Sequence, residues 1–266
     1  VAVAGSSGSG KSLLAHAVMG LLPQNAACQG TVSFEGEILT QKRKEQLRGS
    51  RMVLVPQSVS YLDPLMKVGE QVRRGRKDKE SVERCSEALG RYGLGEDTEG
   101  LYPFELSGGM TRRVLISTAV MEHPRLVIAD EPTPGLHISA ARRVLSHFRE
   151  IADEGAGVLL ITHDLELALE VADRIVVFYA GTNVEEALAA DFGDEQRLRH
   201  PYTRALYRAM PSHGFKAASG TQPYAGDMPM GCPYGPRCSD RDEGCLQEIS
   251  YRSFRDGMVK CRKAGV

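Results

Sequence analysis

Short apolar runs rich in aliphatic and β-branched residues recur along the chain, and stretches with helical periodicity separate them. Near-continuous apolar runs of this kind are typical of strands that are buried on both faces of a parallel sheet. We predict strands at residues 1–4, 51–56, 126–129, 158–162 and 174–179, and helices at residues 12–22, 81–92, 109–122, 140–153 and 165–172. The alternation of strands and helices indicates an α/β fold with a parallel sheet core.

Two parts of the chain depart from this alternation. Residues 30–39, with Glu35-Gly36-Glu37 at their centre, predict a β-hairpin. After Ala180 the strand pattern stops, and Pro, Gly and Cys become more frequent from residue 211 onward. We therefore predict a main domain at residues 1–210 and a small cysteine-rich C-terminal tail at residues 211–266.

The composition is that of an ordinary folded protein, with 42% hydrophobic and 25% charged residues. The formal net charge of −1 gives no indication of a nucleic-acid partner, and we expect none. No apolar run approaches the roughly 18 residues that cross a bilayer, and the amino end carries no export signal. These features predict a cytoplasmic protein. Because the chain begins directly on a predicted strand, we expect upstream sequence to be missing.

A phosphate-binding loop follows the first predicted strand and precedes the first predicted helix. Its sequence matches the pattern G-x-x-x-x-G-K-S/T and consists of Gly5, Ser6, Ser7, Gly8, Ser9, Gly10, Lys11 and Ser12. Glycines let the backbone wrap tightly, so that successive N–H groups point at phosphate oxygens. We expect Lys11 to bridge the β- and γ-phosphates of ATP and the Ser12 hydroxyl to bind Mg²⁺. A chance glycine-rich turn would not require this strand and helix context.

Polar residues follow two other predicted strands. Asp130 and Glu131 follow residues 126–129, and His163 follows residues 158–162. The carboxyl ends of the strands form the ligand-binding edge of an open α/β sheet. We expect Asp130 to hold Mg²⁺ through water, Glu131 to orient or deprotonate the attacking water, and His163 to contact the γ-phosphate. The alternatives are a capping role for the acidic pair and a structural role for the histidine, and the phosphate loop in the same chain disfavours both.

The segment Leu106-Ser107-Gly108-Gly109-Met110 closely resembles the LSGGQ signature of ATP-binding-cassette (ABC) ATPases. Gln57 is similar to the Q-loop glutamine of that family, and His163 to its switch histidine. The resemblance implies a P-loop NTPase of the ABC type, an ATPase with a helical signature subdomain at about residues 60–122. It also implies that Gln57 acts at the Mg²⁺ site and links the nucleotide state to the loop around residues 61–66.

In that family, ATP is sandwiched in a head-to-tail dimer of two ATPase subunits. The resemblance therefore implies that Ser107, Gly108 and Gly109 complete the phosphate site of a second subunit. The family also has an upstream antiparallel part whose aromatic residue stacks on adenine. This chain begins at the strand before the phosphate loop, and no adenine-stacking residue is assigned.

Further segments are similar to the ATPase subunits of dipeptide, oligopeptide and nickel importers. They are residues 61–64, residues 68–71, residues 200–206 and Met110 of the signature. This resemblance implies two membrane permease subunits, an extracytoplasmic solute-binding protein, and a place at the cytoplasmic face of the membrane. ATP hydrolysis would then drive import of peptides, nickel or a related solute. The alternatives are a non-transport ABC protein of repair, translation or cofactor assembly, and a poorly hydrolysing regulatory half-site subunit.

Four cysteines crowd into the tail with the spacing C-x5-C-x6-C-x15-C, namely Cys232, Cys238, Cys245 and Cys261. In a reducing compartment four thiolates suit either tetrahedral Zn²⁺ or an iron–sulfur cluster. Spacing alone does not choose between them, although the wide first spacings suit the bulkier cluster, and unligated thiols are a third possibility. Some subunits of the importer family carry a 4Fe-4S cluster at a similar pattern, so the resemblance implies that cluster, with Zn²⁺ as the alternative.

Two further features are the charge of the tail and the two cysteines that lie outside it. Residues 196–266 contain 12 basic and 6 acidic side chains. We interpret this positive excess as charge that offsets the cysteine thiolates. Cys28 and Cys85 are expected to be small buried hydrophobic residues instead.

The segment after Glu131 departs from the family pattern P-T-S/T-A-L-D. This chain has Pro132-Thr133-Pro134-Gly135-Leu136-His137, so a histidine replaces the D-loop aspartate. In the family that aspartate organises the dimer interface, and a neutral imidazole does not accept the same hydrogen bonds. The departure suggests an asymmetric heterodimer in which a second ATPase subunit has an intact D-loop. The alternative is a tolerated surface variation.

Overall fold

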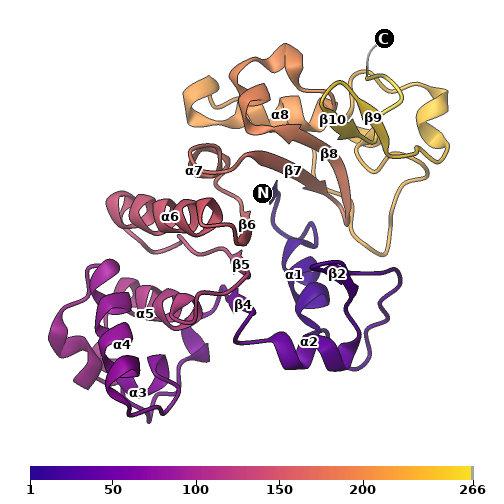
Figure 1. Cartoon of the computed structure of the whole chain (residues 1–266). Coiled ribbons are helices and arrows are strands. Elements are labelled where there is room, and N and C mark those ends of the chain that lie inside the picture. The colour runs from indigo at the N-terminus through magenta and orange to yellow at the C-terminus, as the bar shows by residue number, and fades with distance from the viewer. Residues whose placement is uncertain (265–266) are drawn as a thin grey trace. The chain divides into compact units, whose positions relative to one another are not determined.

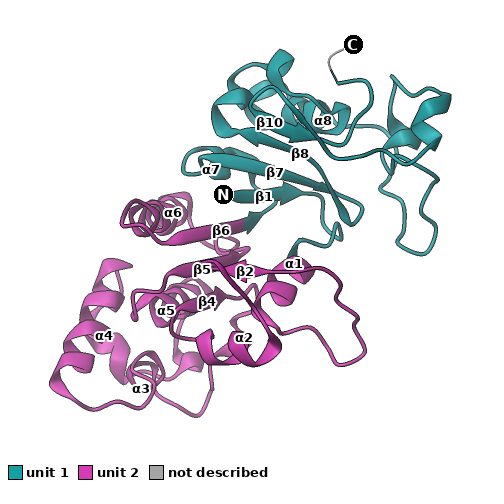
Figure 2. Ribbon diagram, turned by 45° about the vertical axis from the view of Figure 1, so that its right-hand side comes forward, with its two compact units in different colours: residues 1–11, 161–266 teal, residues 12–160 magenta. Residues whose placement is uncertain are grey.

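The computed structural model describes residues 1–264, and its contacts divide the chain into two compact units (Figure 2). Unit 1 comprises residues 1–11 together with the chain from residue 161 onward, and unit 2 comprises residues 12–160. Figure 1 traces the elements in chain order. Among the described residues, no helix is both long and apolar enough to span a membrane.

Unit 2 contains the parallel strands β4 (Met52–Val55) and β5 (Leu126–Asp130), which pair in register from Met52 and Leu126 onward. β6 (Gly157–Thr162) follows β5 in the sheet order and ends in unit 1. These strands lie where the apolar runs predict them. The predicted hairpin is also present as β2 (Ser33–Phe34) and β3 (Glu37–Ile38), joined at Glu35 and Gly36 by a turn in which both residues have positive φ.

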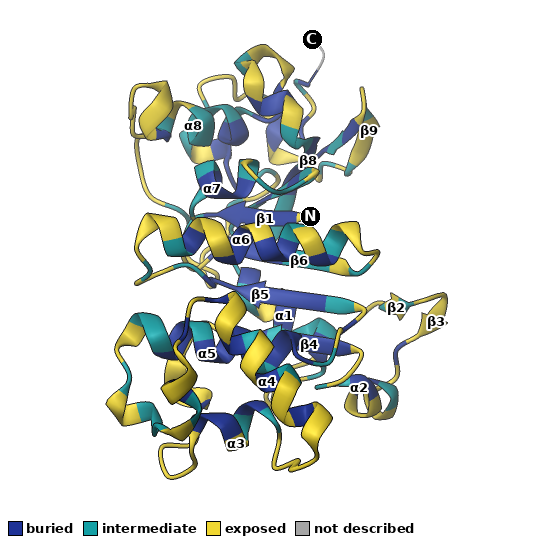
Figure 3. Ribbon diagram, turned by 60° about the vertical axis from the view of Figure 1, so that its left-hand side comes forward, coloured by how far each residue is buried: buried dark blue, intermediate teal, exposed yellow. Residues whose placement is uncertain are grey.

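Most helices of unit 2 bury one face, whereas the helix at residues 108–120 is buried over most of its length. The helices are α1 (Lys11–Met19, whose first residue belongs to unit 1), α2 (Gln41–Leu47), α3 (Val68–Val72), α4 (Lys79–Arg91), α5 (Gly108–Val120) and α6 (Ile138–Asp153). In α6 the buried residues recur every three or four positions, which gives the alternating bands of Figure 3. α3, α4 and α5 share a core that includes Val68, Leu89 and Val114.

Unit 1 contains β1 (Ala2–Gly5), β7 (Arg174–Tyr179), β8 (Thr182–Leu188), β10 (Gly257–Val259) and β9 (Arg252–Phe254), in this order across its sheet. β1 and β7 are parallel, and the other neighbouring pairs are antiparallel. Two helices accompany them, α7 (Leu165–Leu169) and α8 (Pro201–Ala209).

The prediction that the strand pattern stops after Ala180 is wrong. β8 follows β7 through a tight turn, and β10 of the tail pairs with β8 at Met258 and Glu186. The apolar pattern missed β8 because Glu185 and Glu186 lie within it. The boundary proposed near residue 211 stays a prediction.

The two remaining cysteines differ from each other. Cys85 is fully buried in the core of α3, α4 and α5, as expected of a small hydrophobic side chain. Cys28 is exposed, so the same expectation is wrong for Cys28. It lies between α1 and β2, outside any helix or strand.

Candidate nucleotide-binding site

The phosphate loop connects β1 to α1 in a conformation that depends on its glycines. Gly5 has a φ of +155°, and a Cβ at this position would lie 2.2 Å from the carbonyl oxygen of Phe178 on β7. Gly8 and Gly10 also have positive φ, at +75° and +94°. A side chain at position 5 would therefore collide with the backbone of the neighbouring strand. The tight path of the loop beside β7 requires glycine at this position.

The lysine of the loop is folded back over the backbone. Lys11 is 6% exposed, and its Nζ donates to the carbonyl oxygens of Gly5 at 2.8 Å and Ser6 at 3.0 Å. The loop itself is tied to the β7–β8 turn, because the amide of Gly181 donates to the Ser9 carbonyl at 3.0 Å. A positively charged ammonium group is thus held at the mouth of a loop of backbone amides, which suits phosphate oxygens.

In unit 2, Asp130 ends β5 and is 3% exposed. Its Oδ1 is buried and has no hydrogen-bond partner among the described residues. An orphaned buried carboxylate oxygen is costly unless a ligand satisfies it. Mg²⁺ prefers oxygen ligands of this kind. The side chain therefore fits the predicted Mg²⁺ role.

Glu131 follows directly and has a left-handed backbone, with a φ of +48°. This conformation is uncommon for glutamate and persists only where the surroundings impose it. The side chain is 7% exposed. Strain of this kind concentrates at functional sites, which agrees with the predicted role of Glu131.

Arg112 on α5 bonds to the Q-loop and lies within electrostatic reach of the acidic pair inside unit 2, and it was not among the residues predicted from the sequence. Its guanidinium donates to the carbonyl oxygens of Pro56, at 2.8 Å, and of Gln57. Burial lowers the pKa of Arg112, while the nearby carboxylates of Glu131 and Asp130 act in the opposite direction. The sequence signal was available, because Arg112 lies two residues after Met110 on the signature helix.

The signature residues form the start of α5. The Ser107 side chain caps the helix by accepting a hydrogen bond from the Met110 amide at 3.3 Å, and Gly108 is the first helical residue. Ser107 and Gly108 are exposed, and Gly109 is half-buried. The start of α5 is therefore accessible, and its predicted role toward a second subunit stays a prediction.

The predicted site residues are divided between the units. Unit 1 contains residues 5–11 and the exposed His163, which follows β6. Unit 2 contains Ser12, Gln57, residues 107–109 and the acidic pair. Within unit 2, Arg112 bonds to the Q-loop backbone and interacts electrostatically with the acidic pair, and Gln57 itself is exposed. The roles assigned to these residues in catalysis and in metal binding stay predictions.

The four tail cysteines gather without forming a compact metal site. The Cys232 amide donates to the Cys245 carbonyl at 2.9 Å. Burial raises the pKa of Cys232, Cys238 and Cys261, and the charge of other cysteines of the set raises each of these values further. In the described part of the chain, no group of three or more His, Cys, Asp or Glu side chains is placed to hold a metal ion.

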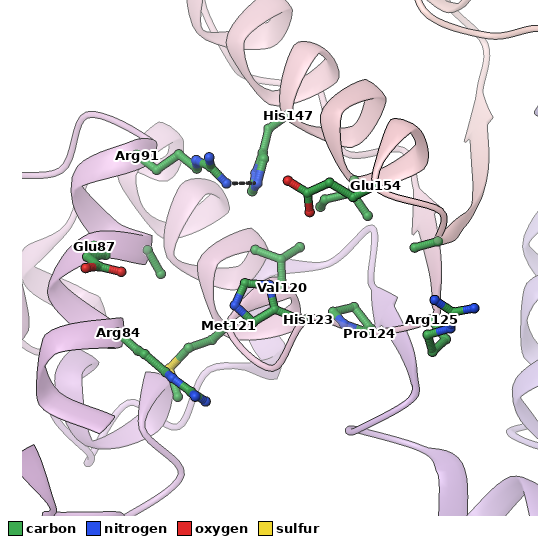
Figure 4. Close-up of a pocket in the computed structure, with 13 residues that line it drawn as sticks. Arg84, Glu87, Arg91, Val120, Met121, His123, Pro124, Arg125, His147 and Glu154 are labelled. Carbon is green, nitrogen blue, oxygen red and sulfur yellow. Dashed lines mark hydrogen bonds between the residues drawn. The ribbon is translucent and has the colours of Figure 1, made fainter. Parts of the chain in front are cut away.

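A pocket of about 580 Å³ lies in unit 2 beside α4, α5 and α6, and none of the predicted site residues lines it (Figure 4). Its basic lining residues are Arg84, Arg91, His123, Arg125 and His147. Each of the three arginines forms an ion pair with a glutamate, namely Glu80, Glu150 and Glu35 respectively. These ion pairs compensate most of the basic charge. The pocket contains none of the residues that are predicted to bind nucleotide.

A second, more apolar groove of about 410 Å³ in unit 2 is lined by residues of the Q-loop region, including Pro56, Tyr61 and Leu62. Beside it, Leu65 is 86% exposed. The loop is held in shape by Gln71, whose Nε2 donates to the carbonyl oxygens of Asp63 at 2.9 Å and Met66 at 2.7 Å. An exposed apolar surface on a rigidly held loop is typical of a protein-binding site.

Two family models match the chain. The model described as ABC transporter matches residues 1–134, and the model described as oligopeptide/dipeptide transporter, C-terminal region, matches residues 184–245. The dipeptide transport ATP-binding protein DppD of Haemophilus influenzae is 36% identical, over 97% of this chain and 84% of the relative. The oligopeptide transport ATP-binding protein OppD of Salmonella typhimurium is 33% identical, over 97% of this chain and 82% of the relative.

Solved structures give a consistent result. The dimeric structure of MJ0796, a bacterial ABC transporter cassette, matches with a TM-score of 0.64 and 25% identity, over 71% of this chain and 84% of that chain. A dimeric post-hydrolysis state of the same cassette, bound to ADP and Pi, matches with a TM-score of 0.63 and 26% identity. The fold of this chain is therefore that of an ATP-binding cassette.

Proposed function

This chain belongs to the ABC transporter family, in the branch that carries the oligopeptide/dipeptide transporter C-terminal region, and from that membership we propose that it is the ATP-hydrolysing subunit of a peptide importer. It would act at the cytoplasmic face of the membrane with two permease subunits, and an extracytoplasmic solute-binding protein would deliver the peptide. The names of the relatives favour peptides over nickel as the solute.

The observation that supports nucleotide and Mg²⁺ binding most directly is the buried Oδ1 of Asp130, which has no hydrogen-bond partner among the described residues. Asp130 and the Ser12 hydroxyl would hold Mg²⁺, with Gln57 beside them, and the bound ion would neutralise phosphate charge. Lys11 would exchange its backbone acceptors, Gly5 and Ser6, for phosphate oxygens. Glu131 would orient or deprotonate the attacking water, and His163 would contact the γ-phosphate.

The groove beside the Q-loop supports a permease as the membrane partner. Tyr61, which lines the groove, and Leu65 on the same loop expose apolar surface, and Gln71 bonds to the loop backbone at Asp63 and Met66. A preformed apolar surface binds a partner helix without a large ordering cost. Arg112 bonds to the Q-loop backbone and lies near Glu131. Movement of the docked partner would therefore be transmitted through Arg112 to the catalytic acid, Glu131. Co-purification with two membrane subunits would test this partnership.

The first prediction concerns Glu131→Gln. We expect the variant to bind ATP but to hydrolyse it at least about 10²-fold more slowly, because loss of a general base or water-orienting group has effects of this size. It should also accumulate an ATP-bound dimer, which size-exclusion chromatography with ATP would detect. Glu248→Gln, at an exposed position of the tail, is the matched control. Unchanged turnover of Glu131→Gln in the assembled importer would remove Glu131 from the catalytic role.

For the tail, we propose that Cys232, Cys238, Cys245 and Cys261 ligate a 4Fe-4S cluster, with Zn²⁺ as the alternative. The hydrogen bond from the Cys232 amide to the Cys245 carbonyl supports a shared site, as does the charge of neighbouring cysteines, which raises the thiol pKa of Cys232, Cys238 and Cys261. The choice of a cluster over Zn²⁺ rests on the resemblance of the cysteine pattern to importer subunits that carry one. Among the described residues no group of three or more His, Cys, Asp or Glu side chains is placed to hold a metal ion, so the arrangement itself does not choose between the two.

The second prediction is that anaerobically purified protein is brown and contains about four iron and four sulfide ions per chain. Cys238→Ser should lose both, because it removes one of the four ligands. Cys28→Ser should retain both, because Cys28 lies outside the tail. A colourless protein with one zinc ion would overturn the cluster but keep the ligand set, and a metal-free protein would overturn the site.

A further inference from the structure

The phosphate loop is held at Ser6 by two side chains from the C-terminal part of unit 1. The Ser6 amide donates to the Tyr202 hydroxyl at 3.3 Å, and the Ser6 hydroxyl donates to Oε1 of Gln222 at 2.5 Å. The same Gln222 oxygen accepts a hydrogen bond from the Ala180 amide at 3.3 Å. Gln222 therefore bridges the phosphate loop and the β7–β8 turn.

Tyr202 is itself rigidly placed. It lies in the first turn of α8 and is 3% exposed, and its amide donates to Nδ1 of His200 at 3.0 Å. Burial raises the pKa of its phenol, so the hydroxyl stays neutral and free to accept from Ser6. A hydrogen bond to a fixed side chain limits the conformations that the first turn of the loop can adopt.

Aromatic packing connects Tyr202 with the cysteine-bearing segment. Its ring centroid lies 4.4 Å from that of Tyr179 and 5.3 Å from that of Tyr234. Tyr234 belongs to the loop between Cys232 and Cys238. Arg237, from the same loop, lies 5.5 Å above the Tyr234 ring and donates to the Tyr179 hydroxyl at 3.2 Å. A continuous chain of contacts thus runs from the cysteine loop to the phosphate loop inside unit 1.

Resting on the ATP-binding function proposed above, we propose that Tyr202 and Gln222 are positioning residues for the phosphate loop, and that the cysteine loop sets their placement through Tyr234. Phosphate affinity depends on the direction of the loop amides, so side chains that restrict the loop raise nucleotide affinity by preorganisation. Because coupling free energies are reciprocal, bound nucleotide must in turn stabilise the cysteine loop.

The first test measures the dissociation constants of Mg²⁺–ADP and Mg²⁺–ATP for the full chain by calorimetry. Gln222→Ala and Tyr202→Phe each remove one hydrogen bond to Ser6, and we expect binding to weaken about 2- to 10-fold, the size of one net hydrogen bond. The KM for ATP should rise by a similar factor while kcat changes little. The matched controls are Gln247→Ala and Tyr224→Phe, both at exposed positions of the tail, and they should bind as the wild type does.

A double-mutant cycle separates positioning from general destabilisation. Ser6→Ala and Gln222→Ala remove the two ends of one hydrogen bond. The nucleotide affinity of the double variant should therefore be no lower than that of the single variant with the lower affinity. Additive losses would show that the two residues act independently and would overturn the role of Gln222.

The coupling between the cysteine loop and the phosphate loop is tested with Tyr234→Leu, which removes the ring between the cysteine segment and Tyr202. We expect weaker nucleotide binding, whereas Tyr207→Leu, at another aromatic position within α8, should leave it unchanged. If Tyr234→Leu fails to fold, hydrogen exchange of the wild type tests the same coupling, because nucleotide should slow exchange of residues 232–238. Unaltered exchange there would overturn the coupling. Failure of the wild type to bind ATP at all would instead overturn the proposed function.

Discussion

Buried polar side chains in this chain are held in defined states by their neighbours, and His147 illustrates how. Its Nε2 lies 2.7 Å from an Arg91 nitrogen, and its Nδ1 contacts the Tyr92 hydroxyl. Because a guanidinium only donates, Nε2 must accept and Nδ1 must carry the proton. Burial, assisted by the charge of Arg91, lowers the pKa of His147 to about 4. The imidazole is therefore neutral in the folded protein at neutral pH.

The third prediction concerns acid stability. As the pH falls below about 6.5, the unfolded chain protonates His147, whereas the folded chain does not until about pH 4. Stability should therefore decrease between these values, and urea midpoints at pH 7.5 and pH 5 would measure the loss. His147→Gln, which keeps hydrogen-bonding groups without a charge, should lose less stability over this range.

His213→Gln, at an exposed position, should keep the wild-type dependence on pH. Some dependence should remain in His147→Gln as well, because burial also lowers the pKa of His200, to about 3. Identical pH dependence in the wild type and His147→Gln would contradict the neutral, buried imidazole.

At the scale of elements, β8 shows how a charged strand can be internal. Glu185 on β8 is fully buried, and its carboxylate accepts from the amides of Arg199 and His200 at 2.9 and 2.7 Å. The Arg199 guanidinium contacts both Glu185 and Asp191, and it also donates to the Phe254 carbonyl before β10. This buried network joins β8, the segment before α8 and the hairpin of β9 and β10.

The fourth prediction compares the two neighbouring glutamates of β8. Glu185→Ala should lower the free energy of unfolding by about 3–5 kcal/mol, because it breaks a buried ion pair with Arg199 and removes the acceptor of the Arg199 and His200 amides. Glu186→Ala should cost about 0–1 kcal/mol, because the Glu186–Arg174 pair is partly exposed. Urea unfolding of both variants would measure the difference, and equal losses would show that the buried network does not stabilise the sheet of unit 1.

At the scale of the whole molecule, the family implies that two ATPase subunits share each nucleotide. His137 replaces the D-loop aspartate that is expected at that interface. In the structure it caps α6, with Nδ1 accepting from the Ser139 amide at 3.4 Å. Aspartate is also a favourable cap at this position. The local role of His137 is thus one that His137→Asp preserves.

The fifth prediction follows from that substitution. If a second subunit supplies the intact D-loop, a pure preparation of this chain should be a weak ATPase, and His137→Asp should raise its turnover or alter its cooperativity. Thermal stability should be nearly unchanged, since the cap is kept, so altered turnover would report on the dimer interface. Strong cooperative hydrolysis by the pure chain, equal in His137→Asp, would instead support a tolerated surface variation.

The sequence by itself determined the elements that depend on local pattern. Apolar runs located β1, β4, β5, β6 and β7, because strands buried on both faces must be apolar whatever packs on them. The phosphate loop could also be predicted from the sequence, because its backbone path requires glycines at fixed spacing, as the close approach of Gly5 to β7 shows. Asp130 and Glu131 were predicted from their place at a strand end.

Only the tertiary structure decided the features whose partners are distant in the chain. Glu185 makes β8 look like a surface segment until Arg199 is placed beside it. Arg112 lies 55 residues from Gln57, and Ser6 lies 216 residues from Gln222. The physical reason is that burying a charge or fixing a loop depends on a specific partner in space, and the local sequence pattern carries no information about which distant residue supplies it.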